Sequence, residues 1–121
     1  MIFVDTCILI DYSRGKIELT DEDFRYFYIN SIVQLEFLAG ALNKRELQKL
    51  NKILSKCTIV EIDQNIMNLS VQLINTYKLS HAMAIYDAII ASTCMIYDLP
   101  LWSYNKKDFK FLDIELLDYK K

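Results

Sequence analysis

The sequence has few residues that break or loosen a polypeptide chain. Its 121 residues include only two glycines and one proline, which excludes a collagen-like repeat and a flexible low-complexity linker. Hydrophobic residues make up 53% of the chain and charged residues 25%, a balance typical of a packed globule and not of a disordered segment. A chain of this length suits one hydrophobic core, so we expect residues 1–121 to form a single domain.

Long hydrophobic runs are also missing. The longest apolar stretch, residues 82–97, is interrupted by Asp87 and is too short to span a bilayer. The first residues, 1–12, lack the basic start and the small-residue cleavage site of a secretory signal. We therefore expect a cytoplasmic protein with no membrane span.

Cysteine and histidine are too few for several kinds of site. The three cysteines, Cys7, Cys57 and Cys94, form no CxxC pair, which argues against a disulfide framework and a zinc site. The only histidine, His81, is expected at the surface or at a helix start, and no site that needs two histidines can be built. The net charge of -2 gives no overall attraction to nucleic acid, so any such role must depend on local charge.

Short apolar segments alternate with segments of helical spacing along the chain. Two helix starts carry capping-box pairs, Ser31 with Gln34 and Asn43 with Glu46, and Asp63 is expected to cap a further helix. We expect strands at residues 2–4, 26–29, 58–62, 101–104 and 114–117, and helices at residues 7–13, 31–40, 43–55, 63–77 and 84–97. Continuously apolar strands between helices indicate a parallel sheet covered on both faces, so the predicted class is three-layer α/β.

Three acidic residues lie where the pattern predicts burial. Asp87 is the only charged residue between positions 82 and 97, Glu36 has apolar or small residues one helical turn away on both sides, and Asp5 ends the first predicted strand. Each has an ordinary structural explanation: a neutral core acid for Asp87, a surface glutamate for Glu36 and a helix N-cap for Asp5. An unpaired buried carboxylate is costly, however, and three of them together favour a functional site.

These acids are expected to share one edge of the sheet. Ligands of an open parallel sheet bind at the carboxyl ends of its strands, where Asp5, Glu36, Asn105 and Asp108 follow predicted strands, and Asp87 joins them if its helix packs against that edge. Carboxylates within about 6 Å of one another repel strongly unless a cation shares the site. A set of carboxylates with at most one amide suits Mg²⁺ or Mn²⁺, and such a site most often hydrolyses phosphodiesters with an activated water.

Four segments of the chain carry a resemblance to a known family: IFVDT at 2–6, NSIVQLEFLAG at 30–40, YDAIIA at 86–91 and LPLWSYNKKDF at 99–109. In this order and spacing they resemble VapC-type PIN-domain ribonucleases, the toxin half of type II toxin–antitoxin pairs. The resemblance implies a three-layer α/β/α PIN-like fold with a mainly parallel central sheet of about four to five short strands. It also implies a hydrolase, an endoribonuclease that cleaves RNA with metal-activated water and leaves a 5′-phosphate and a 3′-hydroxyl.

The resemblance further implies a set of metal ligands. It assigns Asp5, Glu36 and Asp87 to the acidic site, with Asp5 and Asp87 as the direct ligands. The family pattern before the final phenylalanine often begins with threonine, where this chain has Ser103. Asn105 and Asp108 both remain candidates for the fourth position, and Asp108 is favoured because it supplies a full charge.

RNA must be held by local charge in this acidic chain. Lys106 and Lys107, with Lys110, flank the expected acidic edge and are assigned to phosphate contact, together with Ser103. A second basic stripe, formed by Arg45, Lys49, Lys52 and Lys56, recurs at helical spacing and fits an ordinary solvated helix face better than an RNA contact.

The resemblance also implies two protein partners: a second copy of the chain in a homodimer, and an antitoxin that lies along a groove and places a basic side chain at the acidic site. Two other interpretations stay open. A phosphoacceptor receiver domain would use Asp5, Asp63, Ser103 and Lys106, but it wants a pair of acids after the first strand, where only Asp5 stands. The other is a PIN-fold module that binds its partner without catalysis.

Overall fold

The structure is a computed structural model and describes residues 1–118. One sheet of five parallel strands runs in the order β3-β2-β1-β4-β5, so that the first strand of the chain stands in the middle. Its strands are β1 (Ile2–Val4), β2 (Phe27–Ile29), β3 (Thr58–Ile59), β4 (Leu101–Trp102) and β5 (Leu116–Leu117). The predicted parallel sheet and the α/β class are confirmed.

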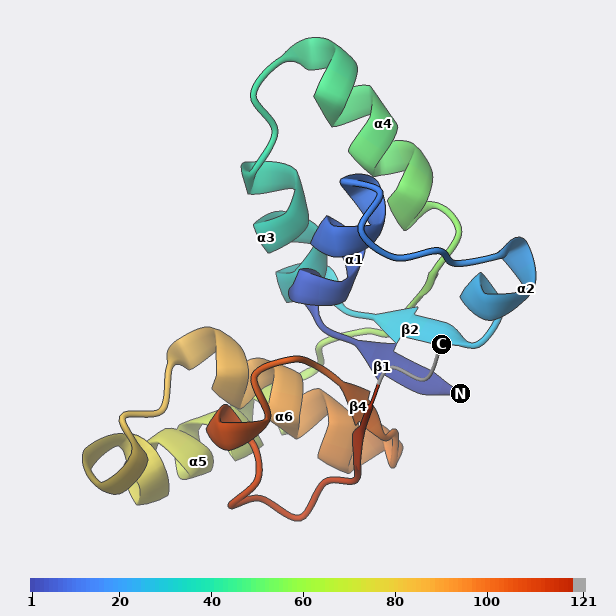
Figure 1. The fold of residues 1–121 in the computed structure, drawn as a ribbon. Helices are drawn as coiled ribbons and strands as arrows, with labels where there is room; N and C mark the ends of the chain where they lie inside the picture. Colours follow the sequence, from blue (N-terminus) through green and yellow to red (C-terminus); the bar gives the residue numbers. More distant parts are fainter. Residues whose placement is uncertain (119–121) are drawn as a thin grey trace.

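Helices cover both faces of this sheet. They are α1 (Thr6–Ser13), α2 (Asp21–Phe24), α3 (Ser31–Ala39), α4 (Lys44–Leu54), α5 (Gln64–His81) and α6 (Ile85–Tyr97), with a 3₁₀ turn η1 (Lys106–Asp108) after β4. Figure 1 shows α1, α3 and α4 on one side of the strands and α5 and α6 on the other. This arrangement confirms the predicted three layers. Among the described helices, none is both long and apolar enough to span a membrane.

The chain reverses its direction across the sheet at β1. From β1 it builds outward through β2 to β3, and after the α5–α6 pair it returns to the other side of β1 with β4 and β5. Phe3 pairs with Tyr28 of β2 on one side and with Leu101 of β4 on the other. In open parallel sheets such a switch point opens a crevice beyond the carboxyl ends of the two strands, which here are β1 and β4.

The core lies between the sheet and the two helical layers. Phe3 and Val4 of β1 are fully buried, as expected for a strand covered on both faces. On the side of α6, a continuous buried run from Ala88 to Cys94 faces the interior, while Ile85 at the start of the same helix is exposed. The middle of α6 is therefore a core helix, and its first turn reaches the surface.

A buried polar contact joins α3 to α6 across this core. Asn30, which is fully buried, is the N-cap of α3: its Oδ1 accepts a hydrogen bond from the Val33 backbone N–H at 3.1 Å. Its Nδ2 donates to Thr93 Oγ1 at 2.9 Å. The predicted capping box at Ser31 and Gln34 is therefore wrong by one position. The Asn30 amide before it accepts a bond from the first turn of α3 and donates one to Thr93 of α6.

Other boundaries differ by a few residues from the prediction. The cap at Asn43 is confirmed, with Oδ1 accepting from the Glu46 backbone N–H at 2.8 Å, and Asp63 caps α5 in the same way. α5 continues to His81 instead of ending near Tyr77, because no glycine or proline stops it before Ala82, whose φ is 52°. The first strand has its predicted bounds, and each of the other four is shorter than predicted because only part of the apolar run pairs with a neighbouring strand.

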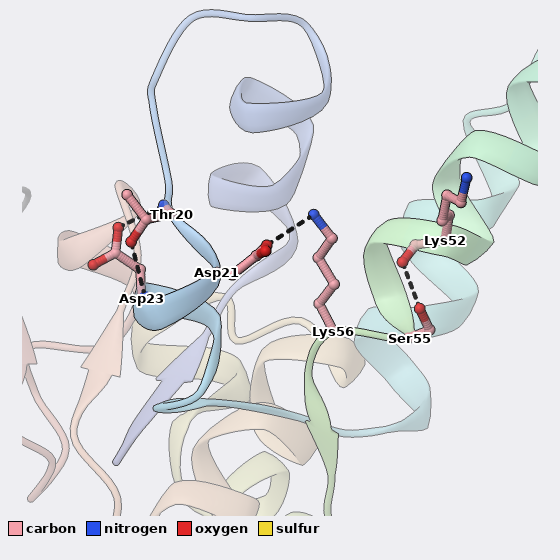
Figure 2. Close-up of polar contacts among 6 residues, drawn as sticks. All are labelled: Thr20, Asp21, Asp23, Lys52, Ser55 and Lys56. Carbon is pink, nitrogen blue, oxygen red and sulfur yellow. Dashed lines mark hydrogen bonds and ion pairs between the residues drawn. The ribbon is translucent and has the colours of Figure 1, made fainter.

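The connection after α1 is tied to the end of α4, as Figure 2 shows. Thr20 and Asp23 form a reciprocal capping box at α2, with hydrogen bonds of 3.2 and 2.8 Å. Lys56 Nζ lies 3.4 Å from Asp21 Oδ1 and 5.3 Å from the centre of the Phe24 ring. Lys56 is thus engaged within the chain, which agrees with a structural reading of this part of the basic stripe.

Candidate metal site

Asp5 leaves the carboxyl end of β1 at the switch point and starts α1. Its backbone N–H donates to the Trp102 carbonyl of β4 at 3.0 Å, and its Oδ1 accepts from the Thr6 backbone N–H at 2.8 Å, so the residue is the N-cap of α1. Only 6% of the residue is exposed. Asp5 therefore joins β1 to β4 through its backbone N–H and caps α1 with its side chain.

Ser103 holds the other oxygen of this carboxylate. Its hydroxyl donates to Asp5 Oδ2 at 2.7 Å and accepts from the Asn105 backbone N–H at 3.0 Å, and the residue is 2% exposed. A serine hydroxyl has only one proton to donate. Ser103 was predicted to contact substrate. In the structure it is buried and donates its hydroxyl proton to the Asp5 carboxylate.

Glu36 approaches the same place from α3. Its side chain is half-buried, and Oε1 accepts a hydrogen bond of 3.0 Å from the Thr6 hydroxyl at the first position of α1. α1 and α3 pack against each other, which is why the residue after Asp5 can reach a helix thirty positions further along the chain. Thr6 thus contacts both acids, Asp5 through its backbone and Glu36 through its side chain.

Two further acids, Asp87 and Asp108, come from α6 and from the η1 turn that follows β4. Asp87 lies in the first turn of α6, where the helix dipole favours a negative charge, and Asp108 ends the η1 turn after β4. Both side chains are half-buried. We call Asp5, Glu36, Asp87 and Asp108 the acidic cluster.

Burial and mutual repulsion raise the pKa of Asp87 to about 6. Burial is the largest cause, followed by the negative charges of Asp5, Asp108 and Glu36 in that order. The other three acids of the cluster are therefore near enough to Asp87 for their charges to act on it. This is the convergence that the sequence analysis predicted for Asp87, which it placed at the edge only if α6 packed there.

The other two shifted acids have the same causes but are partly compensated. Burial raises the pKa of Asp5, the hydrogen bonds from Ser103 and Thr6 lower it, and the charge of Asp108 raises it again. Burial also raises the pKa of Glu36, with Thr6 opposing and Asp5 adding to the rise. Each carboxylate is thus in an environment that penalises its charge, which a nearby cation would relieve.

The chemistry of these donors fits a hard divalent cation. All are carboxylates, which suit Mg²⁺ or Mn²⁺, and no basic side chain within residues 1–118 figures among the causes that set the three shifted pKa values. As the side chains stand, no three Asp, Glu, His or Cys residues in the described part of the chain are arranged to hold an ion. Ion binding would therefore require some of the four carboxylates to turn, while Asp5 and Glu36 are held by hydrogen bonds.

The predicted site residues that follow β4 differ in their exposure and in their partners. Asn105 is exposed, while Asp108 is half-buried and acts on Asp5 and Asp87, which favours Asp108 for the fourth position. Lys106 forms an ion pair with Asp118, and Lys107 is exposed. Of the two predicted phosphate contacts, Lys107 is therefore the one on the open surface, and Lys106 must leave Asp118 to take part.

The basic stripe lies in a different part of the fold. Lys49, Lys52 and Lys56 line a cavity of about 680 Å³ between α4 and the connection after α1, whose lining includes no residue of the acidic cluster. The Lys49 ammonium donates to the Ser13 carbonyl at 2.7 Å. The stripe is thus part of the packing around α4, in agreement with the prediction of an ordinary helix face.

Two residues beside the cluster had no predicted role. Thr6 bonds Glu36, and the Cys7 thiol lies 3.9 Å from the Ser103 hydroxyl. Burial raises the pKa of Cys7, so its thiol stays neutral and is a poor nucleophile. The signal that marks both is their position in the first turn of the helix that Asp5 caps.

Comparison with known proteins agrees with this geometry. The sequence matches the family described as PIN domain over residues 2–115. It is 36% identical over 113 residues to Ribonuclease VapC1 of Methanocaldococcus jannaschii, covering 92% of this chain and 80% of that protein. It is 29% identical over 126 residues to Ribonuclease VapC of Rickettsia bellii, covering 96% and 94%.

A solved structure shares the fold along the whole length. A toxin–antitoxin complex from Klebsiella pneumoniae contains a chain with a TM-score of 0.76 and 27% identity, covering 98% of this chain and 97% of that one. The resemblance drawn from the four sequence segments is confirmed, because the family match spans nearly the whole sequence. The chain belongs to the PIN domain family and is of the VapC type.

Proposed function

We propose that this chain is an endoribonuclease, the toxin of a type II toxin–antitoxin pair, and that it hydrolyses RNA phosphodiester bonds at the acidic cluster. The observation that carries the proposal is the convergence of four carboxylates from separate segments, with the pKa of Asp87 raised to about 6. The ribonuclease names of the two curated relatives support the substrate class. Membership of the PIN family removes the receiver interpretation, and the Asp63 carboxylate it would use instead caps α5.

We assign Asp5, Glu36, Asp87 and Asp108 to the binding of Mg²⁺ or Mn²⁺. A cation bound there would neutralise charge on the reacting phosphate and make a water more acidic. Two of these carboxylates are held in place by hydrogen bonds within the chain. Asp5 is fixed by hydrogen bonds to both of its oxygens, and Glu36 is fixed at one oxygen, so two carboxylates of the cluster are oriented before an ion arrives.

The remaining carboxylates are the more adjustable ones. With a pKa of about 6, the Asp87 carboxyl loses its proton near neutral pH. A cation bound at the cluster would favour this charged form. Exposed Lys107 on the η1 turn stands beside Asp108 and can hold the phosphates of RNA next to the cluster. We propose products with a 5′-phosphate and a 3′-hydroxyl.

We also propose two protein partners. A cognate antitoxin is supported by the Klebsiella pneumoniae structure, described as a toxin–antitoxin complex, and an acidic cluster of this kind would attract a basic side chain from such an inhibitor. A homodimer is supported by exposed Met67, Val71 and Ile85, which border an apolar pocket of about 220 Å³ between α5 and α6. Light scattering of the purified chain measures the second of these directly.

A cleavage assay with matched variants tests the function. Purified chain is incubated with total cellular RNA in MgCl₂ or EDTA, and Asp87→Asn is compared with Asp98→Asn, an exposed aspartate outside the acidic cluster whose left-handed φ of 54° asparagine also adopts. We expect cleavage only with Mg²⁺, loss of cleavage in Asp87→Asn and normal cleavage in Asp98→Asn. Cleavage in EDTA, or by Asp87→Asn, would contradict the proposal. Folded protein that binds Mn²⁺ without cutting RNA would favour the binding-only module instead.

A further inference from the structure

Thr6 forms hydrogen bonds with two different acids of the cluster. Its backbone N–H donates to Asp5 Oδ1 at 2.8 Å and its hydroxyl donates to Glu36 Oε1 at 3.0 Å. The residue is 8% exposed and occupies the first position of α1, so neither bond depends on a mobile surface side chain. The end of β1 and the middle of α3 are thereby joined through one threonine.

The second of these bonds decides how Glu36 presents its carboxylate. A glutamate side chain has three rotatable bonds, so a half-buried glutamate without a partner can take several orientations. The Thr6 hydroxyl restricts these orientations, because it donates its only proton to Oε1 and leaves Oε2 for an ion. Thr6 is β-branched and sits in a helix, so its own side chain has little freedom to follow Glu36 elsewhere.

We infer that Thr6 is a positioning residue that holds Glu36 in the orientation needed to bind the divalent cation. The inference rests on the proposed function, because it requires that Glu36 is a ligand. It assigns a role to a side chain that does not itself contact metal or RNA. Partners that orient metal ligands in this way change metal affinity or activity by about 10- to 100-fold when they are removed.

The test compares Thr6→Val with Thr6→Ser. Valine keeps the shape and the backbone bond to Asp5 but lacks the hydroxyl, whereas serine keeps the donor. Binding of Mn²⁺ is measured by the loss of the free-ion electron paramagnetic resonance signal, and cleavage is measured as a function of Mg²⁺ concentration. We expect Thr6→Val to bind Mn²⁺ about 10-fold more weakly and to need correspondingly more Mg²⁺. Thr6→Ser should stay within about threefold of the wild type, because it restores the donor.

A double variant shows whether Thr6 acts through Glu36. Glu36→Gln and Thr6→Val are combined, and the loss of Mn²⁺ affinity in the pair is compared with the loss in Glu36→Gln alone. If Thr6 positions Glu36, adding Thr6→Val to Glu36→Gln should weaken binding by less than about twofold. A further 10-fold loss in the double variant would overturn the inference, because Thr6 would then act by another route.

Controls separate this inference from the fold and from the proposed function. Thr58→Val on β3 makes the same chemical change at an exposed site outside the acidic cluster and should bind Mn²⁺ normally. Circular dichroism melting checks folding, and Thr6→Ala replaces Thr6→Val if valine does not fold. Wild-type affinity in Thr6→Val, with intact cleavage, would overturn the role of Thr6 and leave the proposed function standing. A wild-type chain that neither binds Mn²⁺ nor cleaves RNA would overturn both.

Discussion

Asp5 and Asp87 belong to the same acidic cluster, yet the fold surrounds them differently. Asp5 receives hydrogen bonds on both oxygens, from the Thr6 backbone and from Ser103, and these bonds offset part of the cost of its burial. For Asp87 every cause of its pKa shift acts upward, burial first and then the charges of three other acids. Both carboxylates are held at a cost, which hydrogen bonds partly offset for Asp5 and which none of the causes of the pKa shift offsets for Asp87.

This difference separates an acid that stabilises the fold from one that does not. Asp5 would be useful as a helix cap even in a protein without activity, so its burial alone says little about function. Asp87 lies in the first turn of α6, where the helix dipole favours its charge, but burial and the charges of three other acids outweigh this and raise its pKa. A cation bound at the cluster, as proposed above, would offset this repulsion.

The largest expected effect is on activity and should be equal at the two sites. We expect Asp5→Asn and Asp87→Asn each to lower the Mg²⁺-dependent cleavage rate by at least about 100-fold, because each removes the charge of a proposed ligand. The measurement is the initial rate on a labelled RNA at saturating Mg²⁺. A variant of Asp5 that keeps more than about a tenth of the rate would show that its carboxylate serves only the start of α1.

A smaller effect is expected at the hydroxyl that supports only Asp5. Ser103→Ala leaves Asp5 Oδ2 and the Asn105 N–H without this partner in a buried place, so we expect about 1–2 kcal/mol lower free energy of unfolding and about 10-fold slower cleavage. Urea unfolding followed by the fluorescence of Trp102, the single tryptophan, measures the stability. Ser103→Thr keeps the hydroxyl and is the control, and equal losses in both variants would point to packing instead of the hydrogen bond.

The sequence predicted the acids of the cluster better than the groups that orient them. Asp87 stands alone among apolar residues in a long helical segment, and such a conflict between charge and burial is visible without a structure. The bond from Thr6 to Glu36 is not visible in this way, because it joins residues thirty positions apart and exists only once α1 packs against α3. Local patterns indicate which residue is out of place, and tertiary packing decides what it contacts.

The same division applies to the fold. Alternating apolar strands and helices were enough to predict a parallel sheet in three layers, because burial on both faces leaves a continuous apolar pattern in the central strands β1 and β4. The exact start of α3 was not predictable, since Asn30 and Ser31 are both good caps and the choice depends on Thr93 of a distant helix. The hydrogen bond from Ser103 to Asp5 had the same limit, because only the packing of β4 beside β1 turns the serine hydroxyl toward that carboxylate.

The smallest expected effect concerns stability and pH, and it should appear at Asp87. In the folded chain its pKa is about 6, against an ordinary value of 3.8, so the folded state holds a proton that the unfolded state has released between these pH values. The stability that this proton contributes is complete below about pH 4 and is lost as the pH rises through about 6. Each tenfold change in proton affinity corresponds to about 1.4 kcal/mol, and solvent around this half-buried side chain reduces the total to about 1 kcal/mol.

Asp87→Asn should therefore be about 1 kcal/mol more stable than the wild type above pH 6.5, and the difference should shrink toward zero near pH 4. Urea unfolding in EDTA at several pH values measures this, and comparing the two proteins cancels the contributions of Asp5 and Glu36, whose raised pKa values act in the same direction. Adding Mg²⁺ at pH 7 should reverse the order, because only the wild type gains stability by binding the ion. A stability difference that does not change with pH would show that Asp87 is not held at an electrostatic cost.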